Sequence, residues 1–451
     1  MPTVPRVKQF SLSILLKFRD DPICYLRELQ DRYGDICQIN KFGQKFYFGY
    51  SPEFAEHVLF SNQKNYSKIE NYKTYHPVFG ENSLFITNKL DQWKHDRRLA
   101  ETSLDLKVHA ADYVGVFTEK CSELVDRIKR NIGDATKPVS IPIEDELTKL
   151  LFHIIQNTLF CDLDIDSTQL PYLKDECHNL ICDKSASLGL LWMLPTKKNR
   201  RYRYLVKYMK AARERMLATR LKSKIDYDDM LGAFLKGHQV TDELTPGFQA
   251  VATQMMTFNL IGQQEASSAL LWAISTLSQY PETAERIASE IALVCGNESP
   301  TYEECAKLDY CRAFISEVLR LHPPLFMVVR QAISKDEVMG YPISAKAKVG
   351  VPLCCLHRHP DYWDKPDEFI PERFLDRPWG QDNEFAYMPF IVGTRNCVAR
   401  NFIFLAMSLI TGILVKNFKF FLPPGFRPER NNSFLVYDRP NLEHILVQAR
   451  H

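Results

Sequence analysis

The stretch Phe390-Ile-Val-Gly-Thr-Arg-Asn-Cys-Val-Ala-Arg400 has a cysteine, Cys397, as its chemical centre. It follows Met388-Pro389 and precedes an apolar run, 401–415, that predicts a long helix. Cys397 is therefore expected close to a helix N-terminus. Unsatisfied backbone N–H groups and the helix dipole favour an anion there, in this case a thiolate.

A thiolate at this place suits haem iron, because it pushes electron density onto the metal and favours O–O cleavage. Gly393 permits a tight turn, and Arg395 offers a guanidinium for a haem propionate. Phe390 can pack beside the sulfur and exclude water. A buried structural thiol is the usual interpretation of an isolated cysteine. The residue types at fixed spacing around Cys397 favour the haem ligand instead.

The order Phe-x-x-Gly-x-Arg-x-Cys resembles the haem-binding loop of the cytochrome P450 family, with Ala399 where the family usually has Gly. Other family motifs precede this loop in the chain, in the order that is usual for the family. They are Trp93–Arg97 (W-x-x-x-R), Glu317–Arg320 (E-x-x-R), Pro323-Pro324, His357–Trp363 (H-R-x-P-x-x-W) and Pro371–Phe374 (P-E-R-F). The resemblance covers nearly the whole chain. It implies a mainly α fold with small β-sheets, as one domain over 1–451, with β-rich parts at roughly 30–60 and 330–390.

The resemblance also implies haem b, held by Cys397 without a covalent attachment, and the absence of C-x-x-C-H agrees. The residues that it implies for contact with the haem are Cys397, Phe390, Gly393, Arg395, Trp93, Arg97 and Arg330. From spacing alone, Trp93 and Arg97 share one helical face, which is also typical of an exposed surface helix. Glu317, Arg320 and Arg373 are expected to form a buried triad of charges.

A long helix is predicted from Thr245 to about Tyr280, with polar residues in its apolar middle. When Gly262 is matched to the family's central helix, Gln264 replaces the usual acid and Glu265 the usual threonine. That pair normally relays protons to iron-bound oxygen. Glu265 can take over this role through water or by its own proton, or it can form a salt bridge elsewhere. The sequence leaves both readings open.

The function implied by the resemblance is that of a monooxygenase, which activates O2 to hydroxylate an apolar small molecule. Electrons are expected from a separate ferredoxin, flavodoxin or flavin reductase, which would dock on Lys94, Arg98 and Arg400. Because Gln264 and Glu265 replace the acid–threonine pair, a haem-thiolate isomerase, dehydratase or peroxygenase is the alternative. A haem-binding sensor or carrier is a third hypothesis.

The composition fits this interpretation. The chain has 451 residues, 45% of them hydrophobic, and its net charge of +2 favours no nucleic-acid partner. The apolar run 10–16 is too short to span a bilayer, so we expect a soluble, cytoplasmic monomer without a transmembrane segment. The 12 cysteines include no C-x-x-C pair and are expected to be reduced. The sequence has an apolar patch at 188–194 and a basic helical tract at 199–224, and the resemblance to the family implies that this region lies over the substrate entrance.

Overall fold

The structure, a computed structural model, describes residues 2–8, 11–41, 43–69, 75–161, 173, 176, 177, 180, 194–223, 225–296, 300–376, 385–431 and 437–450. The chain divides into two compact units. Unit 1 comprises 1–72, 316–397 and 431–438, and unit 2 comprises 73–315, 398–430 and 439–451. Both units combine distant segments of the chain. The expected single domain over 1–451 stays a prediction.

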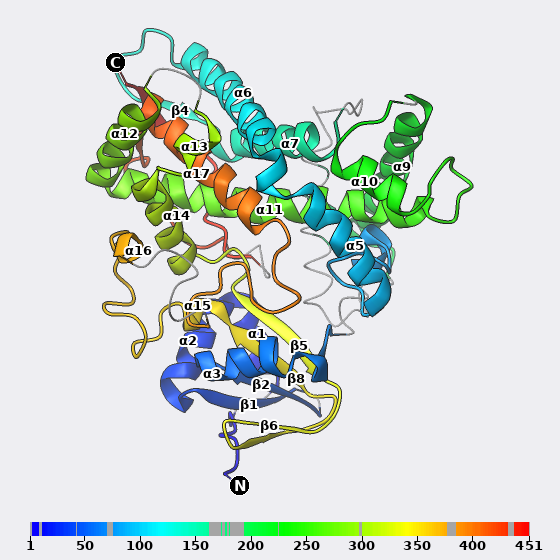
Figure 1. Cartoon of the computed structure of the whole chain (residues 1–451). Helices are drawn as coiled ribbons and strands as arrows, with labels where there is room; N and C mark the ends of the chain where they lie inside the picture. Colours follow the sequence, from blue (N-terminus) through cyan, green and yellow to red (C-terminus); the bar gives the residue numbers. More distant parts are fainter. Residues whose placement is uncertain are drawn as a thin grey trace. The chain divides into compact units, whose positions relative to one another are not determined.

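Unit 1 contains a five-stranded sheet in the order β1-β2-β8-β5-β3 (Figure 1). Its strands are β1 (Ile36–Lys41), β2 (Gln44–Gly49), β3 (Tyr66–Ser67), β5 (Met327–Ala332), β6 (Asp336–Val338), β7 (Tyr341–Ile343) and β8 (Lys348–Pro352). Its helices are α1 (Ser11–Asp20), α2 (Pro22–Tyr33), α3 (Pro52–Glu56), the π-helical turn His57–Ser61, the 3-10 turn Gln63–Asn65, α15 (Leu353–Leu356) and α16 (Arg373–Asp376). β1 and β2 form an antiparallel hairpin within the expected β-rich part at 30–60, and β2 continues the sheet by parallel pairing with β8.

Local sequence explains the start of several unit 1 elements. The Asp21 carboxylate accepts hydrogen bonds from two backbone N–H groups at the start of α2, and the Ser51 hydroxyl caps α3 ahead of Pro52. The side chains of β5 alternate between buried and half-buried, as one strand of a covered sheet should. Val328 and Val351 lie in one buried cluster with Met388 and Val392, which come from the segment before Cys397.

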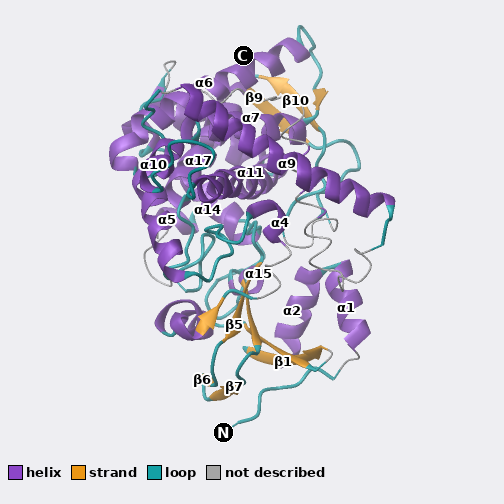
Figure 2. Cartoon of the chain, turned by 90° about the vertical axis from the view of Figure 1, so that its right-hand side faces the viewer, coloured by secondary structure: helices purple, strands orange, loops and turns teal. Residues whose placement is uncertain are grey.

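Unit 2 is mainly helical. Figure 2 looks almost straight down the axis of helix α11 and shows other helices around it. Its helices are α4 (His76–Phe79), α5 (Leu90–Ser103), α6 (Leu106–Ile132), α7 (Ile143–Leu159), α9 (Lys197–Ser223), α10 (Met230–Gly237), α11 (Phe248–Gln279), α12 (Pro281–Cys295), α13 (Tyr302–Cys305), α14 (Asp309–Leu321, which crosses into unit 1) and α17 (Arg400–Asn417). Its small sheet has the order β4-β10-β9, with β4 (Val139–Ile141), β9 (Phe418–Phe421) and β10 (Ile445–Ala449). The mainly α fold with small sheets is confirmed.

The predicted long helix is confirmed as α11, which begins after Gly247 and is followed by Pro281 at the start of α12. It packs against α7, α17 and α10. The basic tract is confirmed as part of α9, whereas 188–193 of the apolar patch lie outside the described residues. Among the helices that the structure describes, none has the length and apolar character needed to cross a bilayer.

Candidate active site

The loop that ends in Cys397 is held by its own backbone. The backbone N–H of Cys397 donates to the Phe390 carbonyl at 2.8 Å, and the Asn396 N–H donates to the Gly393 carbonyl at 3.2 Å. Helix α17 begins at Arg400, so Cys397 lies just before a helix N-terminus, as predicted. Cys397 is half-buried, whereas Cys37 and Cys355 of the same unit are fully buried. Burial raises the pKa of Cys37 to about 12 and also raises that of Cys355, so both remain thiols.

Position 393 requires glycine for two reasons, which are its backbone conformation and the lack of space for a Cβ. Its φ is +76°, and a Cβ there would lie 2.0 Å from the Leu59 carbonyl oxygen. The next residue, Thr394, donates through its backbone N–H and its hydroxyl to Oε1 of Gln63, at 2.9 and 2.7 Å. The loop is thus pinned to the segment after α3.

His357 holds the beginning of the same loop. Its Nε2 accepts the backbone N–H of Met388 at 2.9 Å. Because Nε2 accepts, the neutral ring carries its proton on Nδ1. Burial and the nearby Arg320 guanidinium lower the pKa of His357 to about 3, so the ring is neutral at physiological pH. His357 belongs to one of the quoted motifs, but its role in the loop was not foreseen.

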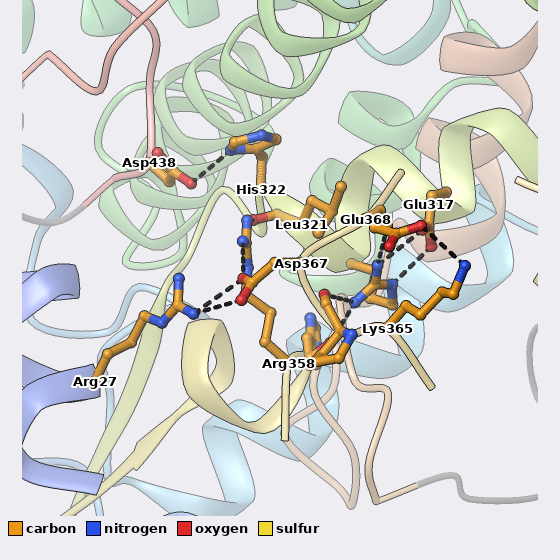
Figure 3. A network of polar contacts seen from close by, with 12 residues as sticks. Arg27, Glu317, Leu321, His322, Arg358, Lys365, Asp367, Glu368 and Asp438 are labelled. Carbon is orange, nitrogen blue, oxygen red and sulfur yellow. Dashed lines mark hydrogen bonds and ion pairs between the residues drawn. The ribbon is translucent and has the colours of Figure 1, made fainter. Parts of the chain in front are cut away.

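The predicted triad of Glu317, Arg320 and Arg373 is confirmed as a set of contacts within unit 1. Arg320 donates to both Glu317 oxygens at 2.7 and 2.8 Å, and Arg373 Nε lies 3.4 Å from Oε1 of Glu317. Figure 3 shows the polar network to which Glu317 belongs, with Glu317 close to Glu368. The remaining Arg320 N–H groups bind the carbonyls of His357, Pro366 and Glu368. A buried pair that is hydrogen-bonded in this way fixes local geometry, because removing either partner leaves an uncompensated charge.

The other candidate ligands of unit 1 are Arg395 and Arg330. Arg395 is half-buried within the cysteine loop. Arg330 lies on β5, is 5% exposed and donates to the Val329 carbonyl at 3.0 Å. Val328, two residues before Arg330, belongs to the buried cluster that contains Met388 and Val392. The strand of Arg330 and the cysteine loop therefore share one core.

In unit 2, Trp93 and Arg97 meet as their spacing predicts. The Arg97 guanidinium lies 5.6 Å from the centre of the Trp93 ring on α5. Trp93 is buried, and Arg97 also pairs with Glu101 through an Nε–Oε1 contact of 2.7 Å. The indole N–H of Trp93 and the guanidinium N–H groups of Arg97 are therefore hydrogen-bond donors on one face of α5.

Helix α11 has one open stripe. Between 251 and 277, every residue is buried except Phe258, Ile261, Gly262 and Glu265. Their spacing of three and four places them on one face. The stripe has free space at Gly262, because a Cβ there would meet only Ile155 Cδ1, at 3.5 Å. Gly262 and Glu265, two of the three predicted catalytic positions, therefore share an accessible surface.

Gln264 does not lie on this accessible surface of α11. Its side chain is 2% exposed, and its Oε1 accepts from Nη1 of Arg439 at 3.4 Å. Arg439 also pairs with Glu144 at the start of α7. The cause is helical geometry, because consecutive residues point about 100° apart. Gln264 thus contributes to the buried packing of α11, and the prediction that it acts beside Glu265 receives no support from this geometry.

The comparison with known proteins identifies the family. The profile of the family described as Cytochrome P450 matches residues 2–446. The chain belongs to the cytochrome P450 family. This cytochrome P450 is 26% identical to cyclooctat-9-en-7-ol 5-monooxygenase of Streptomyces melanosporofaciens, across 90% of this chain and 86% of the relative. It is 28% identical to 11-oxo-beta-amyrin 30-oxidase of Glycyrrhiza uralensis (74% and 66%) and 25% identical to cytochrome P450 4d2 of Drosophila melanogaster (99% and 93%).

As a cytochrome P450, the chain is a monooxygenase-type oxidoreductase that binds haem b. The residues present fit this cofactor. Unit 1 offers a half-buried cysteine next to a helix N-terminus, on a loop where Gly393 leaves no room for a side chain. Arg330 and Arg395 of the same unit carry guanidinium groups, which are the donors that pair with carboxylates such as the haem propionates. The family uses apolar substrates and electron-donor proteins in general.

Proposed function

We propose that this cytochrome P450 inserts one oxygen atom into an apolar small molecule, with Cys397 as the iron ligand. The observation that carries the proposal is the cysteine loop, in which Phe390, Gly393 and His357 fix the backbone around a half-buried Cys397. The reaction converts substrate R–H, O2, two electrons and two protons into R–OH and water. Bound haem supplies the oxygen activation, and the protein supplies binding, orientation and protons.

The chain's own residues divide this work. Cys397 would hold the iron, and Arg330, Arg395, Trp93 and Arg97 would hold the propionates. Phe258 and Ile261 give the open stripe of α11 an apolar surface for substrate, and Glu265 adds one carboxyl group to it. At that place Glu265 can carry a proton or position a water molecule. This role for Glu265 is the finer part of the proposal.

The electron donor is proposed to be a separate ferredoxin, flavodoxin or flavin reductase. Lys94 and Arg98 are exposed and lie four residues apart on α5, and Arg400 is exposed at the start of α17. Together they would attract an acidic partner. Reversal of the charges at Lys94 and Arg98 should slow the reduction of the iron by donor protein, while reduction by dithionite stays unchanged. An unaltered rate with the donor protein would contradict this docking site.

A second candidate function is a peroxide-using oxygenase, and Glu265 favours it. A carboxyl group in the place of the usual threonine can act as an acid–base group toward a peroxide. In that case hydrogen peroxide alone would drive turnover at rates equal to those with electron donor and O2. An isomerase or dehydratase would instead rearrange a hydroperoxide without any added electrons.

The absorption spectrum of the dithionite-reduced protein with carbon monoxide tests the ligand assignment. We expect a strongly red-shifted Soret band for the wild type and its loss in Cys397→Ala. Cys24→Ser is the matched control, because Cys24 is an exposed cysteine of the same unit. A Cys397→Ala protein that keeps the shifted band would refute the proposal. The cytoplasmic location and the monomeric state stay predictions.

A further inference from the structure

Three metal-ligating side chains meet where α5 faces the end of α10. His95 and Asp96 are neighbours on α5, and His238 directly follows α10. One ligand atom from each of the three lies within 4.8 Å of the others. Among the residues that the structure describes, this is the one such group of three. None of the three belongs to the candidate active site.

The packing of α10 against α5 brings His238 to this place. Gly237 precedes it, and a Cβ at Gly237 would lie 2.5 Å from Cδ1 of Leu99. The glycine thus allows the two helices to approach closely. His238 Nε2 then lies 2.7 Å from Oδ1 of Asp96, and the His238 and His95 ring centres are 5.0 Å apart.

Two glutamine side chains orient the Asp96 carboxylate. Gln92 Nε2 donates to both oxygens, at 3.0 and 3.1 Å, and Gln254 Nε2 of α11 donates to Oδ2 at 2.6 Å. Asp96 is 0% exposed. Hydrogen-bond donors behind a ligand of this kind hold it in position and tune its affinity for metal. The carboxylate is therefore fixed in place before any ion arrives.

We propose that His95, Asp96 and His238 bind one divalent transition-metal ion of the zinc type. Two imidazoles and one carboxylate favour such an ion over Mg²⁺ or Ca²⁺, which prefer oxygen ligands only. Two ligand atoms of one tetrahedral zinc ion lie about 3.3 Å apart. The three ligand atoms, which lie within 4.8 Å of one another, would therefore draw together by up to about 1.5 Å. The ion takes the place of the His238–Asp96 hydrogen bond. His95 is exposed and gives access from solvent, and a water molecule completes the coordination.

The consequence is a clamp between two helices. The ion would tie the end of α10 to α5, and Gln254 would connect the same carboxylate to α11. Because α5 also carries Trp93 and Arg97, metal binding would restrict the motion of the helix that presents these two side chains.

Equilibrium dialysis of the haem-loaded protein against Zn²⁺, with metal counting by mass spectrometry, tests the proposal. The exposed His95 can be replaced by alanine without disturbing the core, and His444→Ala is the matched control, because His444 is also exposed but lies outside the group. We expect the wild type and His444→Ala to bind one more equivalent of Zn²⁺ than His95→Ala. Equal stoichiometry and affinity in all three proteins would overturn the proposal.

Two further measurements keep the test independent of folding defects. Gln92→Ala, at a half-buried position, removes a donor behind the carboxylate and should weaken Zn²⁺ binding about 10–100-fold. Zn²⁺ should raise the thermal midpoint of the wild type but not that of His95→Ala, because an ion that binds only the folded state stabilises it. The same rise in both proteins would place the ion elsewhere and reject this site.

Discussion

Met388 donates its backbone N–H to Nε2 of His357 at 2.9 Å, and this bond joins the beginning of the cysteine loop to a segment 31 residues earlier. Met388 also lies in the buried cluster with Val328 and Val351 of the sheet. The loop is therefore held at its start by a neutral histidine and by apolar packing, and further along by the contact between Gln63 and Thr394. The position of Cys397 therefore depends on side chains from distant segments of unit 1.

Replacement of His357 should destabilise the loop unless the new side chain also accepts the hydrogen bond from the Met388 N–H. His357→Leu leaves the buried Met388 N–H without a partner, which costs about 1–3 kcal/mol. His357→Gln places an amide oxygen near the Nε2 position and should recover most of that loss. Denaturant midpoints of the two variants, followed by tryptophan fluorescence, measure the difference. Equal midpoints would show that the acceptor has no role.

The low pKa of His357 should also make stability depend on pH. The unfolded chain takes up a proton on this ring below its ordinary pKa of 6.5, whereas the folded chain resists protonation until about 3. The contribution of His357 to stability is thus complete above pH 6.5 and is lost as the pH falls from 6.5 toward 3. Its slope is about 1.4 kcal/mol per pH unit. Unfolding curves at pH 7 and pH 5 should show a smaller loss for His357→Gln than for the wild type.

Removal of the Glu317 carboxylate should leave a protein without stable haem. Glu317→Ala strands the buried Arg320 guanidinium, at a cost of about 3–5 kcal/mol. Glu368→Ala is the control, because the Glu368 side chain is exposed and its carbonyl still accepts from Arg320. The haem-to-protein ratio after purification measures the effect. Normal haem content in Glu317→Ala would exclude a structural role of the triad in haem retention.

Gly393→Ala should destabilise the cysteine loop by more than the strain of a positive φ, because the new Cβ would also clash with the Leu59 carbonyl. Gly340 is the matched control, because its φ is +77° and a Cβ there meets nothing within 4 Å. Gly340→Ala should cost about 1–2 kcal/mol, as expected for a left-handed residue. Gly393→Ala adds the clash with the Leu59 carbonyl and should reduce the red-shifted band of the carbon monoxide complex. Similar behaviour of the two variants would argue against the clash.

Substitution of Glu265 tests its proposed role in proton delivery. Glu265→Ala should lower turnover about 10²-fold, which is the lower end for general acid–base catalysis, and should lower the product formed per O2 consumed. Glu265→Gln keeps the size of the side chain but not its proton, and it separates shape from chemistry. Unchanged turnover and coupling in Glu265→Ala would remove the relay hypothesis.

The sequence predicted those features that lie within a short stretch of chain. The Cys397–Phe390 hydrogen bond, the Trp93–Arg97 contact and the Glu317–Arg320 pair each join residues less than ten positions apart, and helical or turn geometry sets these contacts. The prediction that Gln264 acts beside Glu265 stays a prediction, and the local geometry of the helix does not favour it. Helical geometry turns Gln264 about 100° away from Glu265, and the sequence already contained that information.

The contacts that were missed join distant segments. Gln63 and Thr394 are 331 residues apart, and Asp96 and His238 are 142 apart. Neither pair carries a motif, and ordinary Gln, Thr, Asp and His residues occur throughout the chain. Only the packing of Gly393 on Leu59 and of Gly237 on Leu99 brings these side chains together. Burial likewise cannot be read from one sequence, so the low pKa of His357 required the fold.

The parallel pairing of β2 with β8 has a consequence for how the protein is made. Phe46 lies opposite Lys348, about 300 residues later in the chain. At ordinary synthesis rates, the β1–β2 hairpin leaves the ribosome roughly 15–60 s before its neighbour exists. During that interval the outer edge of β2 presents unpaired backbone groups to other nascent chains. Assembly of this sheet therefore has to wait until β8 has been synthesised, and until then the open edge of β2 is exposed to incorrect pairing.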